Sequence, residues 1–153
     1  MQEGRATTTR SMFRLASAVT QSIDAPEATV WRLLTNLGEQ SRWNSTLTSI
    51  EGKVALGHRV SFKVPEAPGQ TFNPKVVAYD EAKSMVWRLS FWPLLVSERT
   101  YRLTPAPHGS IEFTISEVFW GLMLPMIART LPDFGLMFER TAADLRAAAE
   151  ARP

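Results

Sequence analysis

The spacing of hydrophobic residues changes along the chain. A loosely alternating segment at 12–23 predicts a strand. Helical spacing follows until position 43, and from 47 to 119 hydrophobic residues recur at about every second position, which is typical of strands. After Gly121 the helical period returns and continues toward the C-terminus. The pattern therefore predicts a strand, a short helical region, a strand-rich middle and a C-terminal helix.

Two short helices are expected between the first and second strands. Asp24 followed by Pro26 is a helix-start signal, because proline in the first turn gives up no backbone hydrogen bond. Hydrophobic residues recur at helical spacing through Leu34, and Gly38 is a residue type that ends helices. A second short helix is predicted over 39–43.

The middle of the chain divides into strands separated by turn-forming residues. Glycine, proline and acidic residues mark each break, and the connections are short. Short connections between successive strands predict an antiparallel meander. With the first strand, this gives a seven-stranded sheet whose further strands are expected at 46–53, 58–64, 70–79, 84–91, 96–104 and 111–120.

The C-terminal segment carries a single apolar stripe, formed by Ile127, Leu131, Phe134, Phe138, Leu145 and Ala148. Pro132 lies inside this pattern and predicts a kink or a helix restart. A sheet with one apolar face must cover it, and this helix is the only predicted element long enough. We therefore expect an α+β fold in which a curved antiparallel sheet wraps around the long C-terminal helix, with space left between them.

Length and composition set the domain organisation. A chain of 153 residues fits one domain, which we place at 12–150. Residues 1–11 lack an apolar centre and are expected to form a disordered tail. No apolar run approaches the roughly 20 residues of a membrane span, and the lack of a signal-peptide pattern favours a cytoplasmic location.

The ionisable residues exclude several function classes. The net charge is only +2 and the basic residues are scattered, so nucleic-acid binding is not expected. Cysteine is absent, and the two histidines, His58 and His108, fall at predicted turns. No zinc site, phosphate-binding loop or nucleophile motif is present in the sequence. We therefore expect no metal and no cofactor.

Alternation along the strands assigns side chains to the inner face. In segment 96–104, Arg99 and Tyr101 share a face, and in segment 111–120 that face carries Glu117. A hairpin closed at 105–109 would place Arg99 diagonally across from Glu117. The predicted lining of the space under the helix is Trp43, Phe62, Trp87, Leu89, Phe91, Arg99, Tyr101, Phe113, Ile115, Glu117, Phe119, Met123, Ile127, Leu131, Phe134 and Phe138.

Arg99 and Glu117 are the most distinctive polar residues on this face. A buried charge is costly unless it is paired. The pair has two interpretations: a structural or partly solvated ion pair, or an anchor that orients a ligand. If the protein is an enzyme, Glu117 is the candidate base, with Arg99 and Tyr101 beside it.

Several short motifs occur in the order found in a known superfamily. They include Ser22–Glu27, Trp43-Asn44, Glu98–Tyr101 and Ser116–Gly121, and they extend over 15–150. In these motifs the chain resembles the SRPBCC superfamily, which includes START-like lipid-transfer domains and polyketide cyclase/dehydrase proteins. The resemblance is greatest to the polyketide-cyclase-like branch. It implies a helix-grip fold with an apolar cavity and does not imply a particular reaction.

Three functions fit these observations. The first is a carrier or sensor that binds a lipid-like, aromatic or polyketide-like molecule. The second is a cyclase, dehydratase or aromatase that uses acid–base chemistry in the cavity. The third is an interaction domain, of a stress-related kind, whose cavity is incidental. A homodimer through an exposed strand edge or the long helix is a further alternative.

Overall fold

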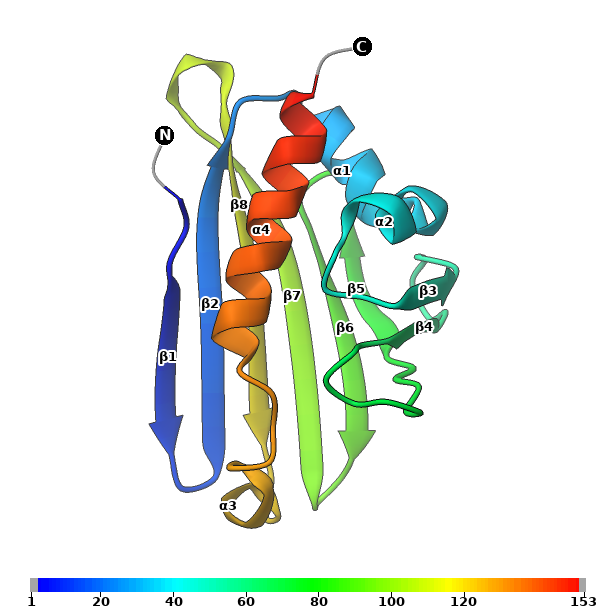
Figure 1. The fold of residues 1–153 in the computed structure, drawn as a ribbon, viewed down its shortest axis with the longest axis vertical. Coiled ribbons are helices and arrows are strands. Elements are labelled where there is room, and N and C mark those ends of the chain that lie inside the picture. The colour runs from blue at the N-terminus through cyan, green and yellow to red at the C-terminus, as the bar shows by residue number, and fades with distance from the viewer. Residues whose placement is uncertain (1–2, 152–153) are drawn as a thin grey trace.

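A six-stranded antiparallel sheet forms the centre of the computed structural model, which describes residues 3–151 (Figure 1). Neighbouring strands in this sheet are joined by antiparallel ladders. In spatial order the strands are β1 (Ala6–Ser11), β2 (Arg14–Ile23), β8 (Ile111–Trp120), β7 (Leu95–Pro105), β6 (Ser84–Phe91) and β5 (Lys75–Asp80). The curved antiparallel sheet and the long C-terminal helix expected from the sequence are confirmed.

The number of strands in the sheet differs from the predicted seven. β3 (Ser49–Gly52) and β4 (Val60–Lys63) pair only with each other and form a small second sheet. Two isolated bridges, Arg59 to Lys75 and Phe62 to Phe72, connect the region of β4 with the first residue of β5 and the segment before it. Pro74 interrupts that segment, and proline cannot donate a ladder hydrogen bond. The predicted strand at 70–79 is therefore shortened to Lys75–Asp80.

The prediction of a disordered tail at 1–11 is wrong over Ala6–Ser11, which forms β1 along the edge of β2. Met1 and Gln2 lie outside the described residues. The Ala6 N–H donates to Glu139 Oε2 at 2.7 Å, which ties the strand to the C-terminal helix. Most β1 side chains are exposed, so no hydrophobic alternation indicates this strand. Its order comes from backbone pairing with β2.

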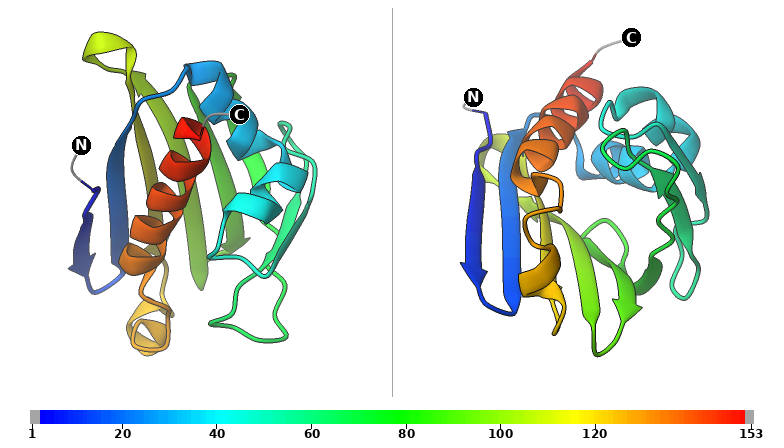
Figure 2. Two further views of the ribbon diagram at one scale, coloured as in Figure 1. Left: turned by 45° about the horizontal axis from the view of Figure 1, so that its top comes forward. Right: turned by 60° about the horizontal axis from the view of Figure 1, so that its bottom comes forward.

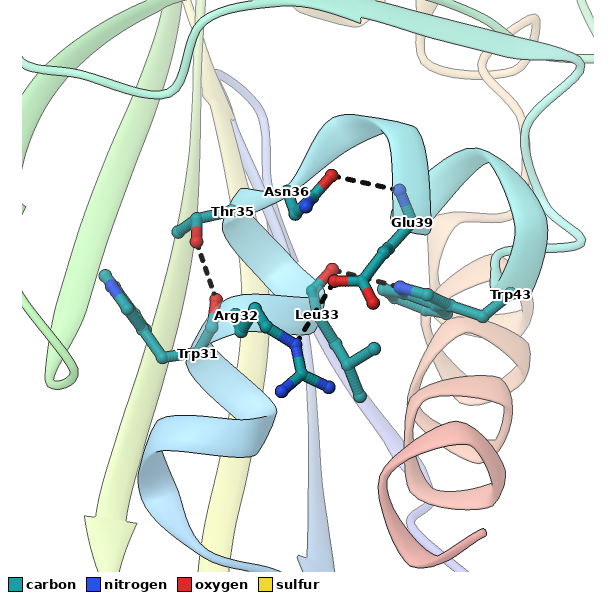
Figure 3. Close-up of polar contacts among 7 residues, drawn as sticks. All are labelled: Trp31, Arg32, Leu33, Thr35, Asn36, Glu39 and Trp43. Carbon is teal, nitrogen blue, oxygen red and sulfur yellow. Dashed lines mark hydrogen bonds and ion pairs between the residues drawn. The ribbon is translucent and has the colours of Figure 1, made fainter. Parts of the chain in front are cut away.

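Two short helices, α1 (Glu27–Thr35) and α2 (Leu37–Trp43), follow β2 as predicted, but Gly38 lies inside α2 and does not end α1. Asn36 separates them, and its side-chain oxygen accepts a hydrogen bond from the Glu39 N–H at 3.1 Å (Figure 3). Side-chain capping of this kind satisfies an N–H that has no partner inside the helix. The Trp43 indole N–H donates to the Leu33 carbonyl at 3.0 Å and holds the two helices together (Figure 3).

The C-terminal region restarts its helix after Pro132, which decides between the two predicted outcomes. A short helix, α3 (Leu124–Ile127), ends before the proline, and α4 (Phe134–Glu150) begins after it. Asp133 caps α4 by accepting a hydrogen bond from the Leu136 N–H at 3.1 Å. The helix packs against β1, β2 and β8. The small sheet of β3 and β4 lies on the side of the molecule away from β1 (Figure 2).

The first turn of α4 approaches β1 closely at Gly135. A Cβ at this position would lie 2.9 Å from the Ala6 Cβ. Gly135→Ala should therefore destabilise the protein by about 1 kcal/mol, because overpacking outweighs the gain in helix propensity. Chemical denaturation measures the change. Gly38→Ala on α2 is the matched control, since its Cβ would meet only the Asn36 side chain at 3.4 Å. Equal stabilisation by both substitutions would contradict this close packing.

Candidate functional site

A cavity of about 510 Å³ lies between the inner face of the sheet, the first turns of α4 and the loop that follows β4. Its lining is mainly apolar: Phe62, Val64, Ala67, Pro68, Phe72, Leu89, Phe91, Leu95, Phe119, Leu131, Pro132, Phe134 and Met137. The polar lining residues are Glu66, Gln70, Ser97, Arg99, Glu117 and Thr130. A space of this size and composition is typical of a small-molecule pocket, for which about 300–1,000 Å³ is usual.

The structure brings together about half of the lining predicted from the sequence. The predicted residues that line the cavity are Phe62, Leu89, Phe91, Arg99, Glu117, Phe119, Leu131 and Phe134. The predicted residues outside this lining are Trp43, Trp87, Tyr101, Phe113, Ile115, Met123, Ile127 and Phe138. For the residues of the second group that lie on the sheet, the position of the helices explains why they are outside the cavity.

The helices cover only one half of the inner face. Toward the end where Tyr101 and Ile115 pair, side chains are buried in the core beneath α4. Toward the other end, Ser97 and Phe119 pair and line the cavity. The alternation of side chains indicates which residues face inward. It does not indicate how far the helices extend over that face.

The remaining predicted residues lie at other places. Trp43 packs on α1 through its bond to Leu33. Met123 and Ile127 belong to the turn after β8 and to α3, past the end of the sheet. Phe138 lies deeper on α4, where it is 1% exposed. For these positions the expected place in the lining is wrong.

Several lining residues were not predicted. Ser97 lies two residues before Arg99 on the same face of β7, and Met137 precedes the stripe residue Phe138 on α4. Val64, Gln70 and Phe72 come from the loop after β4, whose prolines and glycine indicated a turn. In the folded protein this loop lies over the inner face of the sheet. The local sequence does not predict this arrangement, because it depends on how distant segments pack.

A row of polar residues crosses the sheet where core and cavity meet. Glu117 on β8 lies opposite Arg99 on β7 and opposite Ser17 on β2. Ser17 in turn hydrogen-bonds to Thr8 on β1, with 3.1 Å between the hydroxyl oxygens. On the other side of Arg99 lies Trp87, whose buried indole N–H has no hydrogen-bond partner among the described residues.

The register of the β7–β8 hairpin differs from the predicted one by two residues. Pro105 pairs with Ile111, so Arg99 lies directly opposite Glu117 rather than diagonally. A short 3-10 turn, Pro107–Gly109, allows the tighter connection. Because the shift is an even number of residues, each side chain keeps its predicted face.

Arg99 and Glu117 form a buried ion pair. Arg99 Nη2 and Nε donate to Glu117 Oε2 at 2.9 and 3.2 Å, and the two side chains are 11% and 9% exposed. The guanidinium carbon lies 5.3 Å from the ring centre of Phe62 and 5.1 Å from that of Phe138. Such ring contacts stabilise a cation, most of all where water is excluded.

The surroundings of this pair favour the charged form of Arg99. Burial lowers the pKa of Arg99, but the charge and hydrogen-bond interactions with Glu117 and Tyr101 together more than offset this effect and hold the pKa above its ordinary value. Burial raises the pKa of Tyr101, although the nearby Arg99 charge opposes the increase. Tyr101 is therefore a neutral phenol across the physiological range.

The described residues contain no group of three or more histidine, aspartate or glutamate side chains arranged to hold a metal ion. His58 and His108 are both exposed, at turns, as the sequence predicted. None of the helices within residues 3–151 is long and apolar enough to cross a membrane.

The Arg99–Glu117 pair can be tested with a double-mutant cycle. Arg99→Leu and Glu117→Leu should each lower the free energy of unfolding by about 3 kcal/mol, because each leaves one buried charge without its partner. The double substitution should cost less than the sum of the two. Urea denaturation measures the three values.

The control for this cycle is Arg88 and Glu98, which form an ion pair between β6 and β7 and are 46% and 25% exposed. Exposed pairs contribute about 0.2–1 kcal/mol, so a cycle on this pair should show weak coupling. Equal coupling energies in the two cycles would contradict the burial argument.

Comparisons with solved structures place this architecture among known folds. Protein Ms6760 from Mycobacterium smegmatis has a TM-score of 0.70 at 14% identity, over 97% of this chain and 99% of that one. CalU16 from Micromonospora echinospora has a TM-score of 0.69 at 15% identity, over 97% and 87%. Truncated norcoclaurine synthase from Thalictrum flavum has a TM-score of 0.67 at 10% identity, over 99% and 100%. At these identities the similarity shows the fold alone.

Sequence comparison identifies the family. No curated protein sequence matches the chain. The family model described as polyketide cyclase/dehydrase and lipid transport matches residues 14–150, which is most of the chain. This match and the helix-grip neighbours confirm the resemblance noted in the sequence. The chain therefore belongs to the polyketide cyclase/dehydrase and lipid transport family, of the SRPBCC type.

Proposed function

We propose that the protein binds a small, neutral, hydrophobic molecule in the cavity and acts as a carrier or a sensor. The observation that carries this proposal is the cavity itself, about 510 Å³ of mainly apolar space with one buried ion pair at its inner end. An apolar wall favours a hydrophobic ligand through the surface removed from water. The family description, which includes lipid transport, supports the same reading.

The charge state of the ion pair favours a neutral ligand. Arg99 is already compensated by Glu117, so the pair has no net charge to offer an anion. Placing an anionic headgroup beside Glu117 would bring two negative charges together in a site with little water. A carbonyl or hydroxyl oxygen can accept a hydrogen bond from Arg99 or from the Ser97 hydroxyl without that penalty. The proposed ligand is therefore apolar with a neutral oxygen-bearing group.

An enzymatic function is the second candidate. Glu117 lines the cavity and has the chemistry of a general base, and the fold also occurs in an enzyme, norcoclaurine synthase. Tyr101, however, is buried beside Arg99 and outside the cavity lining, so its hydroxyl is not among the groups that a ligand in the cavity meets. The hydrogen bonds from Arg99 also occupy one Glu117 oxygen. These observations favour binding over catalysis.

An incidental cavity is the third candidate, and it requires side chains to seal the space. Phe62, Phe72 and Phe134 line the cavity, and a space of about 510 Å³ remains between them and the other walls. The size of the space therefore favours a ligand-binding role.

The proposal predicts uptake of Nile red, a neutral aromatic dye that carries a carbonyl group. Ser97→Phe should weaken its binding at least about tenfold, because the new ring occupies the cavity. Fluorescence titration measures the dissociation constant. The control is Thr100→Phe, on the same strand but with its side chain on the opposite face. Failure of the natural protein to bind the dye, or equal loss in both variants, would overturn the proposal.

The preference for a neutral ligand gives a separate prediction. Glu117→Gln keeps the side-chain shape but leaves the Arg99 charge uncompensated. The anionic dye anilinonaphthalene sulfonate should then bind about tenfold more tightly, while Nile red binding should change little. Parallel titrations with the two dyes measure the ratio. An unchanged ratio would contradict the assignment of the ion pair to the ligand site.

A further inference from the structure

The end of the molecule nearest the cavity carries an exposed apolar surface. It is built from three turns: the β1–β2 turn, the β6–β7 turn and the segment after β8 that includes α3 (Figure 1). Its principal side chains are Met12, Phe13, Phe91, Trp92, Leu122 and Met126, which we call the apolar end. Met12, Trp92 and Met126 are 70%, 72% and 78% exposed. A cluster of large exposed apolar side chains marks an interaction surface.

The three turns are tied together by backbone hydrogen bonds. The Gly121 N–H donates to the Phe13 carbonyl at 3.3 Å. The N–H groups of Leu122 and Met123 donate to the carbonyls of Pro93 and Leu94 at 3.2 and 2.9 Å. The apolar end is thus a single connected platform rather than three independent loops.

The charged residues within the platform all have one sign. Segments 10–14, 91–95 and 121–130 contain three charged residues, Arg10, Arg14 and Arg129, and no acidic residue. All three arginines are exposed. Large apolar tips flanked by arginine are complementary to an anionic lipid surface, where apolar groups enter the interface and cations meet the headgroups.

The cavity lies directly beside this platform. Phe91, which is 65% exposed, belongs to the apolar end and also lines the cavity. Leu95 and Thr130, at the edges of two of the platform segments, line it as well. A ligand entering from a surface seated on the platform would therefore reach the cavity without crossing the covered half of the sheet.

We propose that the protein docks through the apolar end on an anionic lipid bilayer, which brings the cavity next to the membrane interface. The exposed tryptophan of the β6–β7 turn, Trp92, is a residue type that favours the level of the lipid headgroups. Docking is a separate property from ligand uptake. It goes beyond the proposed function, and each can fail without the other.

A second copy of the chain is the alternative occupant of the apolar end. Two copies joined there would bring their cationic groups together, because Arg10, Arg14 and Arg129 flank the platform with no acidic residue among its segments. Like charges in contact oppose association. The charge pattern therefore favours a lipid surface.

Vesicle co-sedimentation tests the docking. The natural protein should bind vesicles of phosphatidylcholine mixed with phosphatidylglycerol and bind pure phosphatidylcholine vesicles more weakly. Trp92→Ser combined with Met126→Ser should lower the partition coefficient at least about tenfold, because it removes the most exposed tips. Arg10→Gln combined with Arg129→Gln should abolish most of the preference for the anionic vesicles.

The control is Leu56→Ser, which removes an apolar side chain of similar exposure, 63%, from the turn between β3 and β4. It should leave vesicle binding unchanged. Nile red binding by the Trp92→Ser/Met126→Ser protein should also persist, since neither residue lines the cavity. No binding of the natural protein to the mixed vesicles would overturn the docking proposal. So would a dimer in solution that the same double substitution converts to a monomer.

Discussion

The structure depends on how much of the sheet one helix can cover. Pro132 prevents α3 and α4 from forming one continuous helix, and Asp133 caps α4, which therefore begins part of the way along the sheet. Beyond that point the apolar inner face has no helix over it. The loop after β4 lies opposite this uncovered part of the sheet without packing against it. A cavity of about 510 Å³ remains between the loop and the strands. One half of the face becomes core and the other half becomes cavity.

The buried ion pair lies at the boundary between these two halves. Burying Arg99 and Glu117 carries a large desolvation penalty, which the pair offsets through two hydrogen bonds and two aromatic contacts to the cation. Two apolar residues of similar size would fill the same position without this desolvation penalty. The position of the pair, on the cavity lining rather than inside the core, supports the ligand-orienting role that we propose for it.

The cavity and the apolar end fit one physical picture. A hydrophobic ligand dissolves poorly in water, so a binding protein gains from meeting it at a surface where it is concentrated. The three hydrogen-bonded turns present apolar tips and arginines beside the cavity. Binding and docking would then act in sequence, through different residues that can be substituted independently.

Local periodicity determined much of this fold. The alternation in the strands, the helix start near Pro26, the two short helices and the break in the helix at Pro132 follow from nearest-neighbour backbone chemistry, and the structure agrees with them. The inner face was also correct, because a strand alternates with period two whatever its register. The family resemblance added the helix-grip arrangement, which the family match confirms.

Tertiary structure alone decided the rest. β1 has no apolar alternation and is ordered by pairing with β2 and by the bond from Ala6 to Glu139. The direct pairing of Arg99 with Glu117 depended on the length of the hairpin turn. The division of one apolar face into core and cavity depended on where α4 and the loop after β4 come to lie in space. Tyr101 and Ser97 alternate on the same strand face, yet one is core and the other is lining. Their sequence pattern is the same, and only the elements packed above them differ.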